Sequence, residues 1–385
     1  MKKHMNARTR WIIATFTTCC AITASADIPD MLSSFEMGGR GLGMGGAIYS
    51  NASDTSASYW NPAGLGHIDQ SQAEVDFRNR PSNNTTLTGN FTNPEESTSG
   101  QFGRNQFSFV GVAVPLGHGT LGLSYALGGY ARELRRGTGL IVDESKGITA
   151  DVDTRDAVSD EFITLAYGMK RGANMTMGAG IVFARETIMN ATQIQLFQNG
   201  DPIPSPDPTD DNESANGVGG IVGVQFQPGG NANTSFGISL RSPIKLSGFD
   251  IFDSYSDTIP ARLQAGMIFR KDGLRGGRDY LIGGIDAAYY FKANEGKALE
   301  RIGHVSGGIG FEYNLAQTWG FVPIRLGVRS TQRGGSGFTQ RNVITFGLGY
   351  RPSAGRFWVD LAGTAGSGSA RPDFAISIGT LLGRK

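Results

Sequence analysis

Ile324-Arg325-Leu326-Gly327-Val328-Arg329 alternates strictly between large apolar residues and residues that are charged or lack a side chain. Alternation with period two is typical of a β-strand with one apolar and one polar face. A Lys or Arg that faces lipid near the bilayer midplane costs about 2–4 kcal/mol. If such a strand crosses a membrane, Arg325 and Arg329 must therefore point away from lipid. The same argument applies to three acidic residues of other segments: Asp286, Glu312 and Asp360.

About fourteen segments of this kind follow one another from Glu74 onward, separated by clusters of Gly, Asn, Asp and Pro. They are residues 74–80, 106–114, 120–130, 160–170, 175–187, 217–227, 234–241, 261–270, 279–291, 304–313, 323–331, 342–351, 356–363 and 373–381. When these segments are numbered along the chain, the connections from an even-numbered to an odd-numbered segment are short, as at 115–119. The connections from an odd-numbered to an even-numbered segment, such as 131–159 and 189–216, are long. This sorting predicts an all-β fold, an antiparallel transmembrane outer-membrane β-barrel with about fourteen strands and periplasmic turns. Alternation alone also fits a periplasmic β-sandwich whose apolar faces turn inward.

The first residues indicate export. Four basic residues precede an apolar stretch of about a dozen residues, too short for a membrane-spanning helix, and Ala24-Ser25-Ala26 follows as a small-residue cleavage pattern. We expect residues 1–26 to be a signal peptide cleaved near Ala26, which places the protein in the outer membrane of a diderm bacterium. An uncleaved anchor and a lipoprotein, modified at Cys19 or Cys20, are the alternatives.

Residues 27–72 differ from the strands that follow. They are rich in glycine and small residues and contain only a few large apolar ones, so they cannot form a core of their own. The lumen of the barrel would bury these apolar residues, and the segment would close a pore that otherwise leaks. We therefore expect an N-terminal hatch, or plug, at 27–72 and the barrel at 73–385.

Two motifs in this segment resemble a known family. Gly41-Leu42-Gly43-Met44-Gly45-Gly46-Ala47 is followed by Tyr59-Trp60-Asn61-Pro62-Ala63-Gly64-Leu65, a pair similar to the hatch of the long-chain fatty-acid transporter (FadL) superfamily, including TodX and a PorV-like branch. The barrel resembles that family more loosely. The resemblance implies a fourteen-stranded barrel with a hatch in its lumen, where hydrophobic molecules are captured outside and released sideways through a gap in the wall.

The resemblance also implies candidate site residues. In the family the Asn-Pro-Ala of the hatch lies against a kinked third strand, and the corresponding hatch residues here are Asn61, Pro62 and Ala63, with Trp60, Met44, Gly45 and Gly46 beside them. In the third predicted segment, Gly128 and Gly129 are candidates for the kink, because glycine tolerates a bulge. Two glycines aligned along the lumen are an equally good interpretation.

Several functions stay open at this point. The first is transport of hydrophobic small molecules such as fatty acids, in contact with membrane lipid; the second is a PorV-like barrel that escorts exported proteins in type IX secretion. An outer-membrane acyl hydrolase is a weaker third, because His304 and Ser306 share a strand face as in such enzymes. We expect no enzyme activity, cofactor or metal, and a net charge of +1 argues against a nucleic-acid partner.

Overall fold

The structure is a computed structural model, and it describes residues 28–29, 37–80, 104–230, 233–335, 338–353, 355–366 and 373–383. The predicted signal peptide and the first part of the predicted hatch lie outside these residues, apart from β1 (Ile28–Pro29), which pairs in parallel with β16 (Phe338–Thr339). Among the described residues, no helix is long and apolar enough to cross a membrane.

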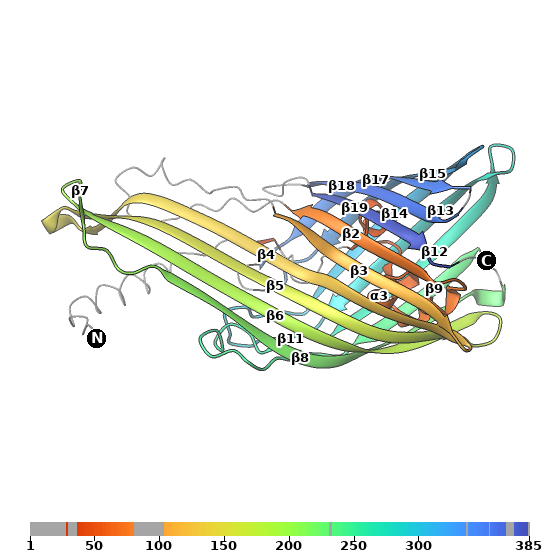
Figure 1. The fold of residues 1–385 in the computed structure, drawn as a ribbon, viewed down its shortest axis with the longest axis horizontal. Coiled ribbons are helices and arrows are strands. Elements are labelled where there is room, and N and C mark those ends of the chain that lie inside the picture. The colour runs from red at the N-terminus through yellow and green to blue at the C-terminus, as the bar shows by residue number, and fades with distance from the viewer. Residues whose placement is uncertain are drawn as a thin grey trace.

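Fourteen antiparallel strands form a closed barrel (Figure 1). They are β2 (Gln72–Arg80), β3 (Arg104–Leu116), β4 (Gly119–Asp143), β5 (Ile148–Lys170), β6 (Met175–Gln198), β8 (Thr209–Phe226), β9 (Thr234–Arg241), β12 (Arg262–Leu274), β13 (Asp279–Tyr290), β14 (His304–Gln317), β15 (Gly320–Thr331), β17 (Arg341–Pro352), β18 (Phe357–Gly366) and β19 (Phe374–Leu381). Each strand pairs with the next along the chain, and β19 pairs with β2 to close the ring. All fourteen predicted segments are confirmed as barrel strands.

The two faces of the wall carry opposite chemistry, as the alternation predicts. Along β15, Leu326 and Val328 are 60% and 50% exposed on the outside, whereas Arg325 and Arg329 are 2% and 4% exposed. The predicted inward-facing acidic residues are buried as well: Asp286, Glu312 and Asp360. These charges therefore face the lumen, and the large exposed side chains of the outer surface are mainly aliphatic and aromatic.

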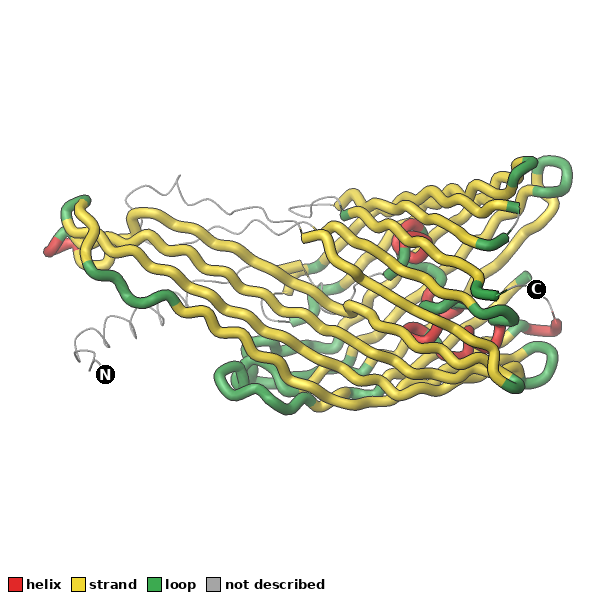
Figure 2. The backbone as a smooth tube through the Cα atoms, in the orientation of Figure 1, coloured by secondary structure: helices red, strands yellow, loops and turns green. Residues whose placement is uncertain are grey.

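The connections predicted as long loops at 131–159 and 189–216 are mostly strand, so that prediction was wrong. We call residues 131–143 of β4, 148–159 of β5, 187–198 of β6 and 209–216 of β8 the strand extension. They stay paired far beyond the barrel (Figure 2), with register shifts in β4 between Gly137 and Leu140 and between Ile141 and Asp143. A short strand, β7 (Asp201–Ile203), pairs with the end of β6, and η4 (Glu144–Lys146) turns β4 into β5. Continued backbone pairing satisfies amide groups that a loop would leave to water.

The opposite end of the barrel has the short connections that the sequence predicts, including η5 (Pro228–Gly230) between β8 and β9. At the base of the strand extension, by contrast, the chain between β9 and β12 folds into a small hairpin of β10 (Ile244–Lys245) and β11 (Thr258–Ile259). Ile244 and Ile259 are buried in the main apolar cluster of the molecule. This hairpin therefore packs inward instead of standing free in solvent.

Candidate functional site inside the barrel

Residues 37–71, called here the N-terminal segment, form four short helical elements: α2 (Gly39–Gly43), η1 (Tyr49–Asn51), α3 (Ala57–Trp60) and η2 (Pro62–His67). Nearly all of their residues are buried, and each element contacts barrel strands. Hydrogen bonds reach many parts of the wall; for example, Ser50 N donates to Asp286 at 2.7 Å and Ser58 Oγ donates to Ser124 Oγ at 2.7 Å. The segment is thus held from several sides by the inner face of the wall.

Glycines of the wall allow the backbone of the segment to approach this closely. A Cβ on Gly308 would lie 1.8 Å from Gly45 O, and one on Gly237 would lie 1.9 Å from Ser50 O. A side chain at either position would overlap the segment. Ten further inward-facing glycines lie around the lumen, and a Cβ on each would come within 3.2 Å of an atom of the N-terminal segment. They are Gly111, Gly122, Gly168, Gly178, Gly223, Gly266, Gly284, Gly310, Gly327 and Gly347. Together the twelve are called the glycine ring.

Met44 and Gly45 lie against this ring with their backbones, and Gly46 packs against Arg329 and Tyr49. Gly45 and Gly46 have φ values of 62° and 78°, which favour glycine, and Arg329 Nη1 donates to Gly45 O at 3.3 Å. Next to them, Arg40 of α2 forms a two-pronged ion pair with Glu312, at 3.0 and 3.2 Å. The motif from Gly41 to Ala47 therefore packs tightly by its backbone, and the preceding Arg40 adds an ion pair to the wall.

Asn61 organises the second motif. Its Oδ1 accepts from Ala63 N at 3.1 Å, and its Nδ2 donates to Ser50 O at 2.6 Å and to carbonyls of β8 and β9 at 3.3 and 3.4 Å. Pro62 lies against glycines of β5 and β6. The family resemblance implied that Asn61, Pro62 and Ala63 face the third strand; instead they lie mainly against β5, β6, β8 and β9.

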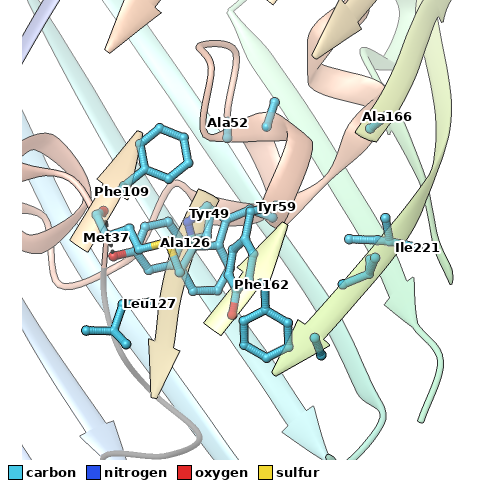
Figure 3. Close-up of a cluster of buried hydrophobic side chains, with 14 of the residues drawn as sticks. Met37, Tyr49, Ala52, Tyr59, Phe109, Ala126, Leu127, Phe162, Ala166 and Ile221 are labelled. Atoms are coloured by element: carbon cyan, nitrogen blue, oxygen red, sulfur yellow. Dashed lines mark hydrogen bonds between the residues drawn. The ribbon is translucent and has the colours of Figure 1, made fainter. Parts of the chain in front are cut away.

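The third strand, β4, is contacted by neighbouring residues of the segment. Leu65 lies at Gly122, and Tyr59 Oη would be 2.5 Å from a Cβ on Gly128. Tyr59 also packs against Phe162 of β5, at 5.5 Å between ring centroids (Figure 3). It lies edge-on against Trp60, which stacks on Tyr49 at 3.9 Å. An aromatic cluster thus connects the segment to the wall near Gly128.

The wall is interrupted at this place. β3 and β4 pair from Leu116↔Gly119 as far as Phe109↔Ala126, and among the described residues their pairing ends there. Beyond that point β3 continues beside β2, and β4 continues beside β5. Each of these neighbouring pairings has a bulge near the break, at Ser108 and at Gly128. Of the two glycines predicted for a kink, Gly128 is the bulged residue, and Gly129 resumes the register.

His304 and Ser306 both face the lumen and are buried. His304 stacks on Tyr290 at 5.1 Å and its Nδ1 lies 2.9 Å from Ile302 O, while Ser306 Oγ lies 2.6 Å from Thr331 Oγ1. The serine hydroxyl therefore pairs with a threonine across the strands. In the described part of the chain, no group of three or more His, Cys, Asp or Glu residues could hold a metal ion.

Sequence reasoning missed two arginines above the aromatic cluster. Arg262 lies over the rings of Tyr59 and Trp60, at 4.9 and 4.6 Å, and Arg241 lies over Phe162 at 4.6 Å. Both residues are at strand ends, where an arginine normally indicates a solvated rim. Their burial depends on the β10–β11 hairpin and the N-terminal segment, which the strand pattern does not reveal.

Comparison with known proteins identifies the fold. No family model and no curated protein matches the chain. A solved FadL homologue of Pseudomonas aeruginosa is similar over 93% of this chain and 99% of its own, with a TM-score of 0.58 and 15% identity. The chain has the FadL-type barrel fold. Two toluene transporters share this FadL-type fold: TbuX of Ralstonia pickettii (TM-score 0.61, 14% identity, 90% of this chain and 98% of that one) and TodX of P. putida (0.60, 12%, 92% and 100%).

Proposed function

We propose that this protein is an outer-membrane channel that takes up hydrophobic small molecules, with fatty acids and aromatic hydrocarbons as the candidate substrates. The strand extension would face the outside of the cell and the short turns the periplasm, residues 1–26 would be a cleaved signal peptide, and the barrel would follow from 73 to 385. Residues 27–72 would act as a hatch. The described structural neighbours include proteins named as toluene transporters, which supports this substrate class.

The interrupted pairing between β3 and β4 is the observation that carries the proposal. In a closed barrel every strand is hydrogen-bonded to a neighbour on both sides. Where part of one pairing is missing, the backbone amide groups of that part have no partner in the wall. The break lies beside the aromatic cluster of Tyr59 and Phe162, which a hydrophobic molecule would contact after leaving water. Each 100 Å² of apolar surface so buried contributes about 2.5 kcal/mol.

Sideways release follows from this arrangement. The lumen below the aromatic cluster is filled by the N-terminal segment, whereas the break leads to the apolar outer surface of the barrel. A hydrophobic molecule would therefore leave through the wall into lipid, down its own gradient, and small shifts of Tyr59 at Gly128 would control the opening. No nucleotide or proton is needed for this step.

Cross-linking the break tests the proposal. Extending the β3–β4 register by one residue would place Ser108 opposite Leu127. A short bis-maleimide reagent that joins Ser108→Cys to Leu127→Cys would therefore close the break. Joining them should abolish uptake of radiolabelled oleate and toluene by cells that express the protein. The matched control is Val112→Cys/Leu123→Cys, which lies in the paired region. Equal uptake after both cross-links would disprove sideways release at this site.

A second candidate function is escort of exported proteins, and the strand extension is the feature that favours it. Four paired strands project beyond the barrel (Figure 1), although the fold needs only short connections there. Replacing residues 138–151 and 193–208 by two-residue turns keeps Gly137↔Val152 and Thr192↔Thr209 as closing pairs. Loss of co-purifying exported proteins with intact uptake would support this role, and unchanged recovery of the same proteins would argue against it.

A further inference from the structure

A groove of about 650 Å³ crosses the outer face of the wall over β13, β14, β15 and β17. It lies near the ends of these strands that face the outside of the cell in the proposed orientation. Its floor is a row of short or polar side chains, each opposite the next across neighbouring strands: Ala287, Gly307, Ser330 and Asn342. The groove is therefore a feature of the membrane-facing surface and not of the lumen.

Two ridges of large side chains border this floor. The ridge on the periplasmic side is a second row of directly opposed residues, which are 46–55% exposed: Ile285, Ile309, Val328 and Ile344. On the other side, Tyr289 and Val305 lie opposite each other and are both 39% exposed. The strands keep their register throughout, so the groove exists because the side chains of the floor are short.

The groove becomes polar toward its extracellular rim. Ser330 Oγ donates to Asn342 Oδ1 at 2.7 Å, and Gln340 Nε2 donates to the same oxygen at 3.3 Å. The exposed Arg333 follows on the same loop; its Nε donates to Gly335 O at 3.3 Å, and it makes no ion pair with any residue that the structure describes. Polar side chains on the outside of a barrel are tolerated near the membrane interface and costly at the midplane. This row therefore marks the depth at which hydrocarbon gives way to lipid head groups.

A lipid of the outer leaflet matches both parts of the groove. An empty groove would deprive the residues around it of dispersion contacts, and a flexible acyl chain can lie along the floor between the ridges. A second copy of the barrel would bring another convex wall, which would rest on the ridges and leave the floor empty. At the rim, Arg333 complements a phosphate, and Asn342 can hydrogen-bond to sugar hydroxyl or amide groups.

We propose that this groove binds a phosphorylated glycolipid of the outer leaflet, with one acyl chain on the floor and a sugar phosphate at Arg333. The proposal goes beyond transport, because it depends on the orientation of the barrel in the membrane and not on what passes through the lumen. It assigns one specific lipid to the β13–β17 side of the barrel, in addition to the lipids that surround any membrane protein.

The test measures lipid retention by native mass spectrometry of the full-length protein in mild detergent. The added lipids are lipid A with two phosphates, lipid A with one phosphate, and phosphatidylethanolamine. We expect one molecule of the bisphosphorylated form per barrel, bound about 10-fold more tightly than phosphatidylethanolamine. Loss of the phosphate at Arg333 should weaken binding about 5-fold.

Variants test the two parts of the groove separately. Ala287→Leu/Ser330→Leu fills the floor and should weaken binding of both forms of lipid A about 10-fold or more. Its control is Ala179→Leu, at an exposed position of β6 outside the groove. Arg333→Met should bind the two forms of lipid A equally, whereas Arg171→Met, on a turn at the opposite end, should keep the wild-type difference. An unchanged thermal unfolding midpoint shows that each variant folds.

Three results would overturn the inference. They are equal retention of lipid A and phosphatidylethanolamine by the wild type, retention of lipid A that survives the filled floor, and a wild-type dimer that the filled floor dissociates. The last result would assign the groove to a second copy. Uptake of oleate and toluene is measured on the same variants and should equal that of the wild type, so the proposed channel stands or fails independently.

Discussion

The half of the barrel from β12 to β19 and the half from β3 to β8 are built differently. In the first, the strands have similar lengths, the register is nearly continuous, and buried charges neutralise one another. In the second, β4, β5, β6 and β8 run far past the wall, and the β3–β4 pairing stops early. The comparison teaches that the N-terminal segment contacts both halves, whereas the interruption of the wall lies in the β3–β8 half alone among the described strands.

The largest expected effect comes from breaking the charge network of the first half. Arg325 Nε lies 2.6 Å from Glu312 and Arg325 Nη1 lies 2.7 Å from Asp360, and all three side chains are buried. Arg325→Met would leave two buried carboxylates with reduced compensation, so we expect a loss of about 3–5 kcal/mol in unfolding free energy. Urea unfolding in lipid vesicles measures it.

The control for this prediction is Lys170→Met. Lys170 pairs with Asp69 at 3.2 Å, but both side chains are mostly exposed, and such pairs contribute about 0–1 kcal/mol. If Arg325→Met cost no more than Lys170→Met, the lumen network would not hold this half of the barrel together.

The next effect concerns the glycine ring. Gly308→Ala places a methyl group on the backbone of Gly45 and must push the N-terminal segment away from β14. Overpacking of this kind costs about 1–3 kcal/mol, and the displaced segment should raise single-channel conductance in planar bilayers. Gly307→Ala is the matched control, because its added Cβ would point outward, 3.3 Å from the nearest atom. Equal conductance of the two variants would mean that the segment does not close the pore.

A smaller effect is expected from the Arg40 ion pair. Arg40→Gln removes a partly exposed contact, and Glu312 keeps Arg325 as its partner. We expect about 1 kcal/mol or less of destabilisation and more frequent brief openings in the same bilayer recordings. Arg40→Lys should fall between wild type and Arg40→Gln, because it keeps the charge but loses the two-pronged geometry. Openings unchanged by Arg40→Gln would show that this pair does not fasten α2.

The two halves also differ in how far the sequence predicts them. Strands with one face toward the lumen and one outward show strict alternation, and Ile324 to Arg329 was sufficient to assign inward and outward faces. In the strand extension residues 148–159 show no sustained stripe of large apolar residues, so their sequence predicts a loop. Asn61 was found by its motif, but its partners on β8 and β9 depend on tertiary packing that no local pattern encodes.

The smallest effect sharpens the comparison at the tip of the strand extension. Lys146 and Ser145 donate to Asp143 at 2.6 Å each, and these hydrogen bonds lower the pKa of Asp143 to about 2. In an unfolded chain the pKa of an aspartate is about 4, so the pKa of Asp143 is lower in the folded hairpin. The resulting stabilisation is therefore complete above about pH 4 and is lost as the pH falls toward 2. A spin label at Glu144→Cys should therefore become mobile in that window, and nearer pH 4 in Lys146→Met. The unfolding midpoint of the barrel should stay the same, since exposed pairs act locally. A shift of that midpoint with Lys146→Met would show instead that the extension and the barrel unfold as one unit.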